Sequence, residues 1–187
     1  MKEPVSLPPL PTLEFDGYSW GAKIKLDTWK GYRASPECGN ESAMAKTSDG
    51  SAFLDITPPD DQDAPPSEEQ IAAYKYLAEN EKAVHQSLMQ AVLDDYPYTR
   101  EAYGYDEETC MPDIEQVEQF RFLIGLGGVA ILRAVKDGVA YIRFDFRAAW
   151  DPEHGFSVLM HKSRAVRMGH PSDGEFGAEE DALNHIS

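Results

Sequence analysis

The alternation of apolar and polar residues over residues 128–169 is the feature that most narrows the fold of this chain. Two runs alternate with a period of two around "KDG" at 136–138, as expected for half-buried strands of a hairpin. In the second run, apolar side chains such as Ile142 and Phe144 point to one face. "FSVLMH" and "AVRMG" repeat the pattern around residues 162–163. The last third therefore predicts a four-stranded antiparallel meander.

Three more strands are predicted near the start of the chain. "LEF" and the alternating run at 22–26 flank Asp16-Gly17, a common hairpin signal. "AFLDIT" at 52–57 is typical of a short strand.

Two helices are predicted between these strand regions. Ser67 and Gln70 form a capping box, after which apolar residues recur at helical spacing, with Pro97 setting the latest end. Pro112, followed by acids and spaced apolar residues, predicts a second, short helix. The expected class is α+β: an antiparallel sheet, made of the N-terminal hairpin and the four-stranded meander, with about two helices packed on one face.

The length of 187 residues and the end segments predict one domain. Residues 1–12 contain four prolines, which fix φ and remove backbone donors, so an extended arm is expected. The single domain is expected over 13–170, followed by an acidic, frayed tail over 171–187.

The net charge of −16 argues against nucleic acid as a partner, because phosphate binding needs clustered Lys and Arg. No apolar leader or membrane-length apolar run is present, so a cytoplasmic protein without a membrane partner is expected. Cys38 and Cys110 stand alone, outside any CxxC pair, which predicts free thiols in a reducing compartment. No cofactor or structural metal is expected.

The charge is unevenly distributed along the chain. Residues 58–119 hold sixteen acids and three bases, for a net charge of −13, whereas 121–170 hold eight bases and four acids, for +4. The acidic run is open to two interpretations: a solvated helix surface, or a landing surface for a cationic partner. The candidate partner-binding residues combine carboxylates with two tyrosines: Tyr103, Tyr105, Asp106, Glu107, Glu108, Asp113, Glu115 and Glu118.

"WDPEHG" at 150–155 also has two interpretations. Its two carboxylates and imidazole would suffice for acid–base chemistry or part of a metal site, yet no HExxH-like spacing accompanies them. As a turn, Asp151 would cap backbone donors, Pro152 would fix φ, and Gly155 would allow a positive φ. The structural interpretation is preferred, for a motif made of Trp150, Asp151, Glu153, His154 and Gly155.

Residues 123–169 resemble the C-terminal half of a family of uncharacterised bacterial domains. In that pattern a helix and two strands precede a WD-x-EHG turn, and a strand hairpin ending in Gly follows. The matching residues are Gly138, Tyr141, Phe144, Phe146, Trp150, Asp151, Glu153, His154, Gly155, His161, Lys162, Val166 and Gly169. Similar small acidic proteins accompany secreted bacterial toxins as immunity proteins, which is what the resemblance implies for function. Ala149 departs from the pattern, which often has a cysteine or small polar residue there.

The function expected is therefore binding and not catalysis. The chain would be an acidic immunity protein that occludes a cognate, basic bacterial toxin or effector. Two alternatives stay open: a metal-dependent or acid–base hydrolase using Asp151, Glu153 and His154, and an effector adaptor or chaperone.

Overall fold

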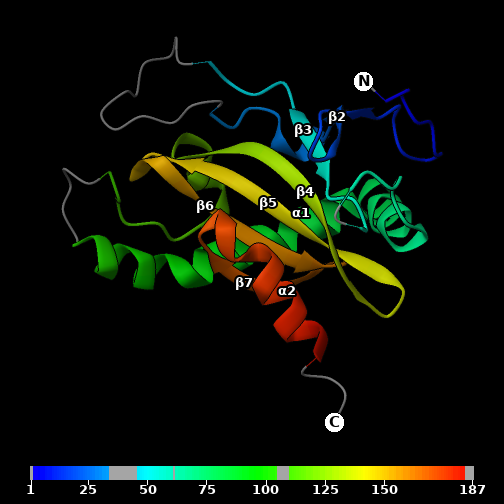
Figure 1. Ribbon diagram of the computed structural model, residues 1–187. Helices are drawn as coiled ribbons and strands as arrows, with labels where there is room; N and C mark the ends of the chain where they lie inside the picture. Colours follow the sequence, from blue (N-terminus) through cyan, green and yellow to red (C-terminus); the bar gives the residue numbers. More distant parts are fainter. Residues whose placement is uncertain (1, 34–45, 61, 105–109, 184–187) are drawn as a thin grey trace.

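The computed structural model describes residues 2–33, 46–60, 62–104 and 110–183 and contains a seven-stranded sheet (Figure 1). The strands are adjacent in the sheet in their order along the chain. They are β1 (Glu14–Phe15), β2 (Trp20–Lys25), β3 (Ser51–Ile56), β4 (Ile124–Lys136), β5 (Val139–Ala148), β6 (Asp151–His161) and β7 (Arg164–Gly169).

The sheet is antiparallel except between β3 and β4. The predicted meander is confirmed as β4 to β7, and Asp137 and Gly138 take the positive φ values (49° and 70°) of a tight hairpin turn. The parallel pairing joins this meander to the N-terminal strands. Because parallel neighbours need a long crossover connection, the chain between β3 and β4 has room for the main helix, α1 (Glu68–Tyr103).

The predicted capping box is present at the start of α1. The Ser67 hydroxyl accepts from the Gln70 N–H at 3.3 Å, and the Gln70 amide oxygen accepts from the Ser67 N–H at 3.0 Å. The Gln70 amide nitrogen also donates to the carbonyls of Thr57 and Leu132. This 1% exposed side chain thus ties the helix start to the end of β3 and to β4.

The expected end of the helix at Pro97 is wrong. α1 continues to Tyr103 and ends at Gly104, whose φ of 97° lies in the left-handed region that closes helices. A proline inside a helix costs about 3 kcal/mol. Packing offsets that cost here: Tyr96 is buried, its ring lies edge-on to Phe120, and its hydroxyl donates to a carbonyl in the following segment.

The second helix expected from Pro112 is also wrong. The chain is non-helical up to a 3₁₀ segment, η3 (Val117–Phe122). The amide oxygen of Gln119 accepts from the backbone N–H groups of Glu115 and Gln116, both at 2.9 Å. These donors are therefore satisfied without α-helical bonds.

α1 and the C-terminal helix α2 (Gly174–Leu183) lie on opposite faces of the sheet (Figure 1). On β4, Val129 and Ile131 belong to the core cluster that includes α1, whereas Ala130 and Leu132 pack with Ala178 of α2. The expected placement of the helices on one face is wrong. Most of the segment expected to fray is instead η4 (Pro171–Asp173) and α2.

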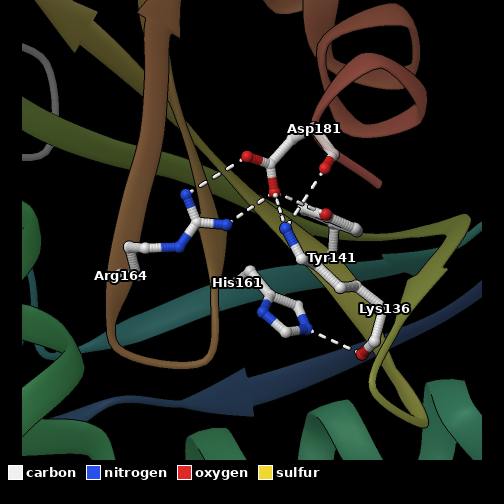
Figure 2. Close-up of polar contacts among 5 residues, drawn as sticks. All are labelled: Lys136, Tyr141, His161, Arg164 and Asp181. Carbon is white, nitrogen blue, oxygen red and sulfur yellow. Dashed lines mark hydrogen bonds and ion pairs between the residues drawn. The ribbon is translucent and has the colours of Figure 1, made fainter. Parts of the chain in front are cut away.

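Charge pairing holds α2 on the sheet, as Figure 2 shows. The Asp181 carboxylate accepts from Arg164 Nη2 at 2.5 Å, the Tyr141 hydroxyl at 2.7 Å and Lys136 Nζ at 3.1 Å. Hydrogen bonding from Arg164, with the other two donors, holds the pKa of Asp181 far below its usual value against the opposing effect of burial. The buried His161 lies against the Tyr141 ring and is 2.9 Å from the Lys136 carbonyl. α2 is therefore held on the sheet by ion pairs of Asp181 in addition to the packing of small residues such as Ala178.

The cysteine expectation also needs correction. Cys110 is disulfide-bonded, and no cysteine is free among the described residues. Cys38, the other cysteine of the sequence, lies outside them.

Across the part of the chain that the structure describes, no helix has the combined length and apolar character needed to cross a bilayer.

Candidate functional site

The WDPEHG segment forms a strand bulge as well as a turn. β5 ends at Ala148, opposite Asp151 at the start of β6. The next paired residue of β6 is Phe156, so residues 152–155 face a single position of β5 and protrude. We call these four residues the β6 bulge.

Gly155 is required where the β6 bulge rejoins the sheet. Its φ is 64°, and a Cβ on it would lie 1.9 Å from the carbonyl oxygen of Phe146. On the other side of the bulge, the half-buried Trp150 stacks on Phe156 and meets Tyr96 edge-on, each at 5.7 Å between ring centroids. The chain is therefore held in place on both sides of the β6 bulge, by the packing of Trp150 before it and by Gly155 at its end.

Asp151 connects the bulge to α1. Its Oδ1 accepts from the His154 N–H at 3.0 Å and lies 3.1 Å from His154 Nδ1, while its Oδ2 accepts from the Tyr103 hydroxyl at 2.7 Å. Burial alone would raise the pKa of Asp151, but these hydrogen bonds outweigh it and lower the pKa. Burial, with the Asp151 carboxylate, raises the pKa of Tyr103 to about 12.

A pocket of about 230 Å³ opens between these elements. One wall is the last turns of α1, with Asp95, Thr99 and Tyr103. The opposite wall comes from Trp150 and Asp151 and from residues 168–170 at the end of β7; Gly155 and Phe156 complete the lining.

The pocket combines carboxylates with neutral donors. Asp95 accepts from the Thr99 hydroxyl at 2.8 Å, and Asp151 is bound as described above. Within the described ranges, neither carboxylate lies in a salt bridge with Lys or Arg. Nδ1 of His170 accepts from the Ser172 N–H at 3.2 Å, and no Lys or Arg is among the described residues that line the pocket. The pocket therefore presents an excess of negative charge.

The predicted partner-binding residues are separated by the fold. Tyr103 turns toward Asp151 and joins the pocket, whereas Asp113, Glu115 and Glu118 are exposed on and before η3. Asp113 also forms an ion pair with Arg100. The remaining candidates lie outside the described residues: Tyr105, Asp106, Glu107 and Glu108.

The sequence interpretation named Tyr103 but missed the other two pocket-facing residues of α1, Asp95 and Thr99. Asp95, Thr99 and Tyr103 are spaced four residues apart, which places them on one side of a helix. That signal was concealed by the expectation that Pro97 ends the helix.

Within the described residues, the β6 bulge does not provide a complete set of metal ligands. Glu153 and His154 are exposed on the bulge, next to the more buried Asp151. No group of three His, Cys, Asp or Glu side chains that could hold a metal ion occurs in the described part of the chain. A first coordination shell usually needs at least three such protein ligands.

The comparisons with known proteins give one match. The model of a domain family described as "Domain of unknown function (DUF6985)" matches residues 23–176, which run from β2 into the start of α2. This match agrees with the resemblance to a family of uncharacterised domains. No curated protein and no solved structure matches the chain.

Proposed function

The chain belongs to the DUF6985 domain family, and we propose that it is an acidic binding protein that neutralises a cognate bacterial toxin or effector by occlusion, as an immunity protein does. The proposed binding face is the acidic surface, which we define as the exposed carboxylates at the C-terminal end of α1 and on the segment after it. These are Asp94, Glu101, Asp113, Glu115 and Glu118.

The distribution of ion pairs supports this choice of face. On the opposite face of the sheet, cations are neutralised within the chain: Lys136 and Arg164 pair with Asp181, and Arg167 pairs with Glu180. On the acidic surface only Asp113 forms a salt bridge among the described residues, with Arg100. The surplus negative charge is thus presented beside α1, where it can steer a cationic partner.

The observation that carries the proposal is an exposed aromatic residue among these carboxylates. Tyr98 is 73% exposed, and Asp94 and Glu101 lie four residues before it and three after it, on the outward side of α1. Exposed charges chiefly increase the association rate, whereas a tyrosine that becomes buried on binding supplies affinity. This arrangement provides both.

The test uses the protein product of the adjacent gene, because an immunity protein is normally encoded beside its toxin. The two proteins are mixed, and the association rate and Kd are measured at rising salt. The double variant Asp94→Asn/Glu101→Gln should associate more slowly and show a weaker salt dependence, and Tyr98→Ala should weaken binding by about tenfold or more.

A matched double variant distinguishes local from general electrostatics. Glu14→Gln/Glu79→Gln removes the same charge from exposed positions away from the acidic surface. Equal losses for both pairs would contradict the assignment of the face, and a salt-insensitive complex would contradict its electrostatic basis.

A hydrolase is the second candidate, favoured by the 3.1 Å approach of Asp151 to His154 beside the pocket. An imidazole oriented by a carboxylate is a feature of acid–base catalysis. His154 does not line the pocket, however, and Asp151 is already used in holding the bulge. Metal analysis, with Asp151→Ala and His154→Ala compared in hydrolase assays, tests this candidate: a metal-free protein whose variants lose only stability would rule it out.

A further inference from the structure

We infer that the pocket between α1 and the β6 bulge receives the guanidinium group of an arginine side chain from the bound partner. This inference rests on the proposed function, since it identifies the kind of residue that the bound partner would insert beside the acidic surface. The pocket and the acidic surface share the C-terminal turns of α1: Asp95 and Thr99 line the pocket, and the adjacent Asp94 is exposed.

The size of the pocket favours a side chain over a cofactor. Sites for small-molecule ligands and cofactors usually span about 300–1,000 Å³. The volume here is about 230 Å³, below that range and sufficient for the end of one long side chain.

The charge of the pocket favours a cation. Asp95 and Asp151 line it; Asp95 accepts from a hydroxyl, and Asp151 accepts from a hydroxyl and a backbone N–H. Each ionised carboxylate accepts several hydrogen bonds, so acceptor capacity remains for an incoming donor. No Lys or Arg is among the described lining residues to repel an incoming cation.

The aromatic wall favours arginine over a compact ammonium. Phe156 is stacked between Trp150 and Phe146, so Trp150 and, on the α1 side of the pocket, Tyr103 are the lining rings left to contact a ligand. A guanidinium is planar, stacks on aromatic faces and donates in a fork that matches carboxylates. A small cavity that contains both aromatic rings and carboxylates therefore suits a guanidinium, which can stack on the rings and donate to the carboxylates.

The experiment titrates the whole protein with N-acetyl-arginine amide and needs no partner protein. The readout is the indole N–H resonance of Trp150 in an NMR spectrum, with the buried Trp20 and Trp29 as internal references. We expect a saturable shift at Trp150 with Kd on the order of 1 mM, the range of a single side-chain contact. The neutral isostere N-acetyl-citrulline amide should bind at least about fivefold more weakly, because charge-assisted hydrogen bonds are about twice as strong as neutral ones.

A matched pair of variants separates the pocket from general electrostatics. Asp95→Asn should weaken binding of the arginine probe by about tenfold, from the loss of one charged partner. Glu79→Gln removes the same charge from an exposed position of α1, outside the pocket lining and the acidic surface, and should leave Kd within about twofold by the small effect of exposed charges. Asp151→Asn, which keeps an acceptor for the bulge, is the second pocket variant should Asp95→Asn fail to fold.

The outcomes separate this inference from the proposed function. No saturable shift at Trp150, equal binding of citrulline and arginine probes, or equal effects of Glu79→Gln and Asp95→Asn would overturn the arginine pocket, even if a salt-dependent partner complex forms. Selective arginine binding that is lost in Asp95→Asn would support the pocket, even if the adjacent gene product fails to bind.

Discussion

The hydroxyl of Tyr103, in the last turn of α1, donates a 2.7 Å hydrogen bond to Oδ2 of Asp151, at the first position of β6. The two residues are 48 positions apart in the sequence. Their contact joins a residue predicted to bind a partner with one predicted to build a turn. The pocket exists at this junction, so its shape depends on both.

Replacing Tyr103 by Phe should lower the free energy of unfolding by about 1 kcal/mol, the net contribution of one hydrogen bond. The pKa of Asp151 should also rise, because a hydrogen bond that favours its ionised form is lost. Urea denaturation and an NMR titration of the carboxyl group measure the two effects. Tyr98→Phe, on an exposed tyrosine of the same helix, is the control and should change neither; a Tyr103→Phe protein with an unchanged Asp151 titration would show that the bond is absent in solution.

Replacing Gly155 by Ala should be among the most damaging single changes, costing more than about 3 kcal/mol by combined backbone strain and overpacking. The new Cβ would overlap the Phe146 carbonyl oxygen. Gly138→Ala is the matched control, because Gly138 has a similar φ of 70° with no heavy atom within 4 Å of its ideal Cβ. It should cost only about 1–2 kcal/mol from the left-handed backbone. Equal losses in chemical denaturation would mean that the bulge relaxes to make room.

Replacing Asp181 by Asn should release α2 and lower the free energy of unfolding by about 2–3 kcal/mol. This value is below the range for breaking a fully buried ion pair, because the Asp181 side chain is partly exposed. The pKa of Asp181 is lowered on folding, so its contribution is present above its ordinary pKa of 3.8 and is lost only as pH falls toward the much lower folded-state value. The difference between wild type and variant should therefore be constant from pH 7 to about 5. Hydrogen exchange of the α2 amides checks the release, and Glu180→Gln, next to it, should have a small effect. Unchanged α2 protection in Asp181→Asn would contradict the ionic anchor.

In protein purified without reductant, Cys110 should not react with a thiol-specific reagent after denaturation, because Cys110 is disulfide-bonded. Reduction should lower stability by about 2–4 kcal/mol. Reactive thiols in the unreduced protein would instead favour the reducing compartment predicted from the sequence.

The parts of the fold that the sequence predicted are those fixed by local rules. The Ser67–Gln70 capping box and the turn at Asp137-Gly138 each depend on a few adjacent residues, and both are present. Pro97 was misjudged because the burial of Tyr96, a tertiary effect, maintains the helix past it. α2 was missed because the packing of Ala178 and the pairing of Asp181 with distant cations are both tertiary effects.

The candidate site was predicted only in fragments, for the same reason. Asp151 and Gly155 have local roles that could be read from "WDPEHG". Asp95 and His170 had no recognisable motif, because only the packing of α1 against the end of β7 brings them to one pocket.

The parallel contact between β3 and β4 has a consequence for the order of folding. Phe53 pairs with Gly128, seventy-five positions later, whereas the strands of the meander pair with their sequence neighbours. Closing the longer loop costs more chain entropy, so we expect the meander to form first and to act as the template on which β2 and β3 are added late. Pulse-labelled hydrogen exchange should therefore protect amides of β5 before those of β3, and the reverse order would exclude this route.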